Sequence, residues 1–150
     1  MEGVRKKMRQ ITSFLVKKTN KTYPEIIEEG KERGFLYPAP HVYVYKFEPL
    51  NENEEWKHIR GRPIASPCAL IRDSNIARNS IGIMLYCKDD EEIHPDAMIL
   101  AAHMIKLFTE DLGIKDYSII TDHEDKKAAI DTMQMHSSVA MALSIFNKRI

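Results

Sequence analysis

Two short stretches combine carboxylates with a histidine, the side-chain types that can bind a divalent metal ion. The first contains Asp89, Asp90, Glu91, Glu92 and His94, and the second contains Asp122, His123, Glu124 and Asp125. Mg²⁺ and Mn²⁺ take oxygen and imidazole ligands, and a bound ion can activate water against a phosphoester. Asp89, Asp90, Asp122 and His123 are therefore the candidate ligands of a metal-dependent phosphoester hydrolase.

The same acidic residues also have a purely structural explanation, because each stretch precedes or opens an expected helix. Carboxylates at a helix start accept hydrogen bonds from free backbone amides and interact with the helix dipole, by ~0.3 to 1 kcal/mol each. Neither stretch has the spacing of a specific metal-binding motif. The sequence therefore favours helix capping and no cofactor, with Mg²⁺ or Mn²⁺ as the alternative.

A second group of candidates is basic and centres on the segment Arg60-Gly61-Arg62. Arginine forks match the oxygens of phosphate or carboxylate, and glycine lets the backbone approach a ligand closely. The further members of this anion pocket would be Trp56, Arg72 and Arg78. The alternative is a solvated hairpin loop with an edge strand that its charges protect from pairing, and the sequence favours this alternative.

An aromatic strand is the third candidate. β-Branched and aromatic residues alternate from His41 to Phe47, so His41, Tyr43 and Tyr45 share one face of a strand. Such a row can stack against bases or nucleotides. It is more often a packed face of a sheet, which is the interpretation the sequence favours.

The elements that position these residues are clearest between Ser80 and Asp125. Residues 81–87 are apolar on both faces of a predicted central strand, and Pro95 opens a helix that Gly113 ends. A helical crossover implies that the next strand, 117–121, runs parallel to 81–87. The acidic stretches would then follow strands that end at one edge of the sheet, where α/β folds usually bind ligands.

The remaining elements complete the prediction. Apolar residues at spacings of three and four predict an amphipathic helix over 4–18, and a capping threonine with Pro24 predicts a second helix from Thr22 to Gly34. Residues 68–72 read as a short strand that forms a hairpin with 81–87, and 122–150 as a helical tail. The chain is thus expected to be a single domain, 1–150, with an α+β or α/β sandwich fold, a mixed sheet of about four strands and the order ααβββαβα.

The composition of the chain limits its expected partners and location. Twenty-two basic and 22 acidic side chains give a net charge of zero, which does not favour nucleic acid as the partner. Cys68 and Cys87 have no ligand spacing, so we expect a reducing, intracellular (cytoplasmic) location. No stretch approaches the ~18 to 20 apolar residues of a membrane span, so no membrane partner is expected. The eight methionines are compatible with an adaptable contact in a homo-oligomer.

Motifs of enzymes are missing from the sequence: there is no G-x-S-x-G, no H-E-x-x-H and no glycine-rich phosphate loop. The sequence therefore favours a non-enzymatic binding or interaction protein. Its expected partner is an anionic, nucleotide-like small molecule or another protein, bound by the basic loop and the aromatic strand. The alternatives are the metal-dependent phosphoester hydrolase and a purely structural subunit.

Overall fold

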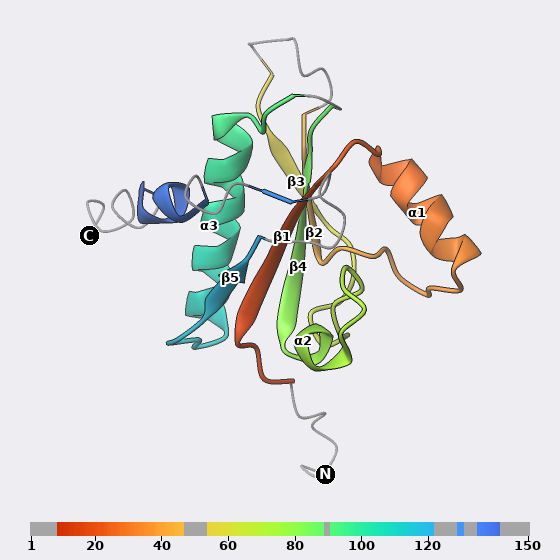
Figure 1. Cartoon of the computed structure of the whole chain (residues 1–150), viewed down its shortest axis with the longest axis horizontal. Helices are drawn as coiled ribbons and strands as arrows, with labels where there is room; N and C mark the ends of the chain where they lie inside the picture. The colour runs from red at the N-terminus through yellow and green to blue at the C-terminus, as the bar shows by residue number, and fades with distance from the viewer. Residues whose placement is uncertain (1–8, 47–53, 89–90, 122–128, 131–134, 142–150) are drawn as a thin grey trace.

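A five-stranded mixed sheet forms the centre of the protein (Figure 1). The computed structural model describes residues 9–46, 54–88, 91–121, 129–130 and 135–141. The strands are β1 (Ser13–Thr19), β2 (Val42–Tyr45), β3 (Lys57–Arg60), β4 (Ser80–Tyr86) and β5 (Ser118–Ile120). Their spatial order is β3-β2-β4-β1-β5. All neighbours pair in parallel except β3, which lies antiparallel to β2 at one edge.

Helices cover both faces of this sheet. They are α1 (Tyr23–Glu32), α2 (Ser74–Arg78) and α3 (Pro95–Asp111), and residues 135–141 are also helical. Helix α3 lies on one side of the sheet, and α1 and α2 lie on the other (Figure 1). The prediction of an α+β or α/β fold with a mixed sheet is thereby confirmed in its α/β form, with five strands in place of about four.

The core has two parts, one on each face of the sheet. On the α3 side, alternate strand residues such as Phe14, Val16 and Ile83 pack against the apolar face of the helix. On the α1 side, Leu15 and Tyr43 belong to a second cluster. Residues of α1 and of the segment before α2 complete this cluster. Strand side chains alternate between faces, so one apolar run supplies both clusters.

Strand β1 corrects the predicted helix over 4–18. Residues 13–19 form a strand between β4 and β5, and residues 1–8 lie outside the described part of the chain. Phe14, Leu15 and Val16 are each 0% exposed, which requires cover on both faces. The helical spacing of apolar residues is real in the sequence, but burial of three consecutive residues in a central strand outweighs it.

The predicted strand 68–72 and its hairpin are also wrong. This segment is a turn-rich loop, and Asp73 caps α2 by accepting hydrogen bonds from the amides of Asn75 and Ile76. The loop packs on β4 at Gly82, where an added Cβ would lie 2.8 Å from the Cys68 Sγ and the Leu70 Cδ1. The close approach at Gly82 therefore comes from a loop.

Local signals for the other helices are confirmed. The Glu25 carboxylate accepts hydrogen bonds from the Thr22 amide (3.0 Å) and hydroxyl (2.9 Å) at the start of α1. His94 caps α3 through its Nδ1, which accepts from the amide of Asp96. Gly34 and Gly113 follow the two helices with positive φ angles of 80° and 65°, a conformation that favours glycine.

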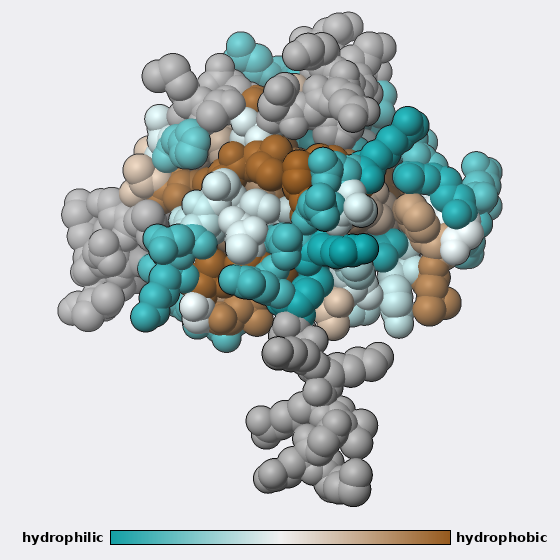
Figure 2. Space-filling view, turned by 60° about the horizontal axis from the view of Figure 1, so that its bottom comes forward, coloured by the Kyte–Doolittle hydropathy of each residue, from teal (hydrophilic) through white to brown (hydrophobic). Residues whose placement is uncertain are grey.

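One face of the molecule combines polar and apolar groups. With the bottom of Figure 1 brought forward, hydrophobic residues form a band across the middle of the described surface, with hydrophilic residues around it (Figure 2). Among the described residues, no helix combines the length and the apolar character that crossing a membrane requires.

Candidate functional site

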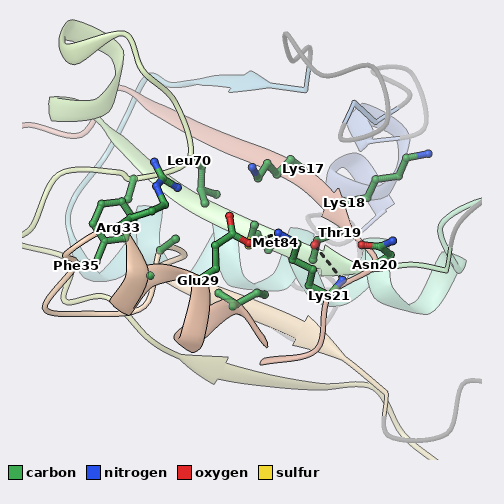
Figure 3. A pocket seen from close by; sticks show the side chains of 14 residues that line it. Lys17, Lys18, Thr19, Asn20, Lys21, Glu29, Arg33, Phe35, Leu70 and Met84 are labelled. Carbon is green, nitrogen blue, oxygen red and sulfur yellow. Dashed lines mark hydrogen bonds and ion pairs between the residues drawn. The ribbon is translucent and has the colours of Figure 1, made fainter. Parts of the chain in front are cut away.

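A pocket opens at the carboxyl end of β1, between this strand and α1 (Figure 3). Its volume is about 310 Å³. The residues that line it are Lys17, Lys18, Thr19, Asn20, Lys21, Ile26, Glu29, Gly30, Arg33, Phe35, Ala39, Ala69, Leu70 and Met84. Thr19 pairs with Tyr86 of β4, so the two parallel strands end together at this edge of the sheet. Such an edge is the usual ligand site of α/β folds.

The polar side chains that line the pocket make contacts with one another and with neighbouring residues at the ends of β1 and α1. Lys21 forms an ion pair with Glu29, and its amide donates a hydrogen bond of 3.2 Å to the Thr19 Oγ1. The Arg33 guanidinium stacks over the Phe35 ring at 4.5 Å from its centroid. Figure 3 shows the side chains of Lys17 and Arg33 ending on either side of Leu70, with Glu29 nearer to Lys21.

The charge of the lining is strongly positive. Four side chains are basic, those of Lys17, Lys18, Lys21 and Arg33, and Glu29 is the one carboxylate among the lining residues. Lys17 and Lys18 are successive strand residues, so they point to opposite faces, and Lys17 faces α1. The floor is apolar, because Ile26, Leu70 and Met84 are buried there. The pocket is therefore suited to a ligand that combines a negative charge with an apolar group.

A divalent metal ion does not fit the described residues. They contain no group of three or more His, Cys, Asp or Glu side chains placed to hold an ion. The pocket offers one carboxylate, already paired with Lys21, among cations that repel a metal. The predicted ligands Asp89, Asp90, Asp122 and His123 all lie outside the described part of the chain.

The basic loop predicted as an anion pocket forms the edge strand β3 and the turn after it. The Arg60 guanidinium lies 4.5 Å from the centroid of the Phe108 ring on α3. Arg62 donates a hydrogen bond of 3.1 Å to the Pro38 carbonyl and stacks on Phe35 at 5.1 Å. Burial lowers the pKa of Arg62 from its ordinary value. Both arginines thus contact aromatic rings of the protein itself.

Trp56, a predicted member of that pocket, is partly buried and packs against the core on the α3 side. Its ring lies 5.6 Å from that of His94, measured between centroids. Arg72 and Arg78 are exposed residues beside and within α2. The structure therefore does not bring Arg72 and Arg78 together with Trp56.

His41, the first residue of the predicted stacking face, is 0% exposed. Its Nδ1 accepts a hydrogen bond of 2.9 Å from the Gly82 amide, so the proton of the neutral ring is on Nε2. The Nε2 then donates to the Ser66 carbonyl at 2.8 Å. Burial lowers the pKa of His41 to about 4, helped by the positive charges of Arg9 and Arg62 and opposed by the bond to Ser66.

Tyr43 and Tyr45 do share a face, and their rings stack with centroids 5.8 Å apart. Tyr43 is 2% exposed and donates a hydrogen bond of 2.7 Å to the Lys21 carbonyl. Burial raises the pKa of Tyr43 well above its ordinary value. The aromatic row packs inside the protein, as the favoured interpretation of the sequence expects.

None of the eight predicted ligand-binding residues lines the pocket at the end of β1, and a binding role for them stays a prediction. The pocket residues that sequence reasoning missed are Lys17, Lys21, Glu29 and Arg33. A signal for them was present, since Lys17-Lys18-Thr19-Asn20-Lys21 directly follows the apolar run Phe14–Val16. Once that run is recognised as a central strand, polar residues at its carboxyl end become site candidates.

Comparison with known proteins supports the α/β class of the fold. No family model and no curated protein sequence matches the chain. Among solved structures, an endolysin N-acetylmuramoyl-L-alanine amidase, LysCS from Clostridium intestinale URNW, superposes with a TM-score of 0.56 at 16% identity. N-acetylmuramoyl-L-alanine amidase LysC from the same source gives a TM-score of 0.56 at 17% identity. Each alignment covers 89% of this chain and 85% of the other.

These likenesses correct the predicted function. The sequence favoured a non-enzymatic, nucleotide-binding or interaction protein, and the finding that the solved structures sharing the fold are amidases contradicts that prediction. The predicted phosphoester hydrolase agrees with them only in being a hydrolase, since an amide is a different bond. The structural subunit receives no support from this comparison.

Proposed function

We propose that this chain is a hydrolase that cleaves an amide bond of the N-acetylmuramoyl-L-alanine type in the pocket at the end of β1. The observation that carries the proposal is the shared fold, which extends over 89% of the chain and over 85% of two amidases. The position of the pocket supports it as well, because the carboxyl edge of parallel strands is where enzymes of this architecture bind substrates.

The pocket contains groups that amide hydrolysis needs. The Glu29 carboxylate can accept a proton from a water molecule as the water oxygen attacks the carbonyl carbon. The positive charge of Lys21, paired with Glu29, lies where it can stabilise the negative charge that develops on the carbonyl oxygen. The carbon–nitrogen bond then breaks, and Glu29 returns the proton to the leaving nitrogen. The products are a carboxylic acid and an amine, which at neutral pH become a carboxylate and an ammonium group by transfer of the second proton of the water.

The test is hydrolysis of N-acetylmuramoyl-L-alanine, followed by chromatography and mass spectrometry of the N-acetylmuramic acid and L-alanine released. We expect release by the wild-type chain and a loss of at least about 100-fold in Glu29→Gln, as for removal of a general base. Glu110→Gln is the matched control, because Glu110 is also ion-paired to a lysine, at 3.3 Å, but on α3 across the sheet. No release by the wild type, or equal rates for both variants, contradicts the proposal.

A divalent ion at Asp89, Asp90, Asp122 and His123 is the second part of the proposal, for Mg²⁺ or Mn²⁺. Its support is that β1 and β4 end at one edge and that residues 89–90 follow β4 in the sequence. An ion that binds only the folded chain raises the melting temperature by mass action. We expect Mn²⁺ to raise it for EDTA-treated wild type and not for Asp122→Asn. An identical response of the two proteins speaks against these ligands.

The expected homo-oligomer and the expected reducing, intracellular location also stand as proposals. Sedimentation of the purified chain tests the first, and fractionation of cells that express it tests the second.

A further inference from the structure

We infer that the loop after α1 docks on the surface of a lipid bilayer that contains anionic phospholipids. In this contact Leu36 enters the apolar layer, and Arg33 and Arg62 bind headgroup phosphates. The inference goes beyond the proposed amide hydrolysis and does not depend on it. It rests on residues 33–38, which follow α1 in the chain, and on Arg62 in the turn after β3.

An exposed leucine forms the apolar part of this surface. Leu36 is 85% exposed, the largest value among the large hydrophobic side chains of the described residues, and its neighbour Tyr37 is 41% exposed. The loop that carries them lies at the outer side of the molecule, beyond the sheet (Figure 1). A bilayer interface accepts an apolar side chain in its acyl layer and favours tyrosine at the level of the headgroups.

Contacts with the rest of the chain fix the loop on both sides of Leu36. Before it, the Phe35 amide donates a hydrogen bond of 2.8 Å to the Gly30 carbonyl, and the Phe35 ring packs against the core on the α1 side. After it, the Pro38 carbonyl accepts a hydrogen bond of 3.1 Å from the Arg62 Nε. The exposed leucine is therefore presented by an ordered backbone, which lowers the entropic cost of docking.

Two guanidinium groups supply the positive charge. Those of Arg33 and Arg62 lie 4.5 Å and 5.1 Å from the centroid of the Phe35 ring, and Figure 3 shows Arg33 beside this ring. Neither arginine forms an ion pair with another residue in the part of the chain that the structure describes. Burial is the main cause that lowers the pKa of Arg62, and the charge of Arg33 lowers it further. A phosphate bound by both arginine forks relieves this repulsion.

The order of these groups matches an anionic bilayer, in which charged headgroups lie directly above an apolar layer. The carboxylates of α1 limit the contact to the loop, because Glu28 and Glu32 are exposed on the helix and an anionic surface repels them. The expectation of no membrane partner rested on the lack of a spanning segment in the sequence. Docking through one loop needs no such segment.

The experiment is sedimentation of the full chain with two kinds of vesicle, one of phosphatidylcholine alone and one of equal parts phosphatidylcholine and phosphatidylglycerol. We expect at least about 10-fold tighter binding to the anionic vesicles. Arg33→Gln and Arg62→Gln should each weaken that binding by about 3-fold or more, while Arg33→Lys retains it. Lys106→Gln, which removes a positive charge from α3 across the sheet, is the matched control and should bind as the wild type.

The apolar contact is tested with the same vesicles. Leu36→Ser should weaken binding to the anionic vesicles by at least about 5-fold, because less apolar surface is buried, and Leu36→Trp should retain it. Leu112→Ser is the matched control, since Leu112 is also an exposed leucine but lies at the end of α3. Circular dichroism establishes that each variant is folded.

No binding to the anionic vesicles, or equal binding of wild type and Leu36→Ser, overturns the inference. Equal binding of the wild type to both kinds of vesicle overturns the role of the two arginines and with it the anionic bilayer as the partner. Binding that depends on the arginines and not on Leu36 indicates a phosphate site without insertion, which contradicts docking. If the wild type leaves the vesicles unbound but self-associates through Leu36, the loop contacts a second copy of the chain and the inference fails. None of these results involves cleavage of an amide, so they leave the proposed function to its own test.

Discussion

His41 is a titratable side chain enclosed by the fold. It has a donor, the Gly82 amide, at Nδ1 and an acceptor, the Ser66 carbonyl, at Nε2. Only the neutral ring with its proton on Nε2 satisfies both bonds, because a proton on Nδ1 would face the Gly82 amide. The Arg9 Nη2, 3.1 Å from Nε2, adds a positive charge that disfavours the imidazolium.

This arrangement predicts a dependence of stability on pH. The folded-state pKa of His41 is about 4, below the ordinary value of 6.5, so the unfolded chain binds more protons between these values. The stability that His41 contributes is therefore present above pH 6.5 and is lost as the pH falls towards 4, by about 3 kcal/mol at most. Urea unfolding of wild type and His41→Gln from pH 7 to pH 4 measures this difference.

The comparison between the two proteins removes the effect of other titrating groups, since these are common to both. His58→Gln is the control, because His58 is exposed on the edge strand β3. The explanation fails if wild type and His41→Gln lose the same free energy of unfolding over this pH range.

At the scale of elements, the loop from Cys68 to Leu70 packs on β4 without a helix between them, and Gly82 makes this possible. Gly82→Ala should lower the free energy of unfolding by about 1 to 3 kcal/mol, because its Cβ would lie 2.8 Å from both Cys68 and Leu70. Gly30→Ala is a matched substitution at a site where the added Cβ meets Phe35 at an ordinary 3.5 Å. We expect it to be neutral or to stabilise α1 by up to about 1 kcal/mol. Urea unfolding of both variants at pH 7 tests the contrast, and a larger loss for Gly30→Ala would contradict it.

Elements with local signals could be predicted, and those defined by their neighbours could not. The ends of α1 and α3 are encoded in adjacent residues, by Thr22 with Glu25 and by His94 with Pro95, so short-range rules find them. Strand β1 has an apolar spacing that also suits a helix, and its position between β4 and β5 decides the outcome. The loop 68–72 has the composition of a strand, but it lies over the sheet and not within it.

At the scale of the whole molecule, the fold is what this chain shares with the two solved amidases. At 16% and 17% identity, no run of residues identifies that relation, whereas the backbone superposes over 89% of the chain. A fold can persist while most side chains change, because it depends on the pattern of burial more than on particular residues. The absence of catalytic motifs in the sequence was therefore a poor argument against an enzyme.

The sequence by itself determined the α/β class, the caps of α1 and α3, the apolar strand β4 and the packed aromatic strand β2, because each depends on neighbouring residues and on burial. Only the tertiary structure decided that β1 is a central strand and that its end, with α1, encloses a basic pocket. Lys17 and Arg33 are 16 positions apart in the sequence and face the same cavity. No local sequence pattern predicts that these two side chains line one pocket, because their proximity depends on how α1 packs against β1 in the folded chain.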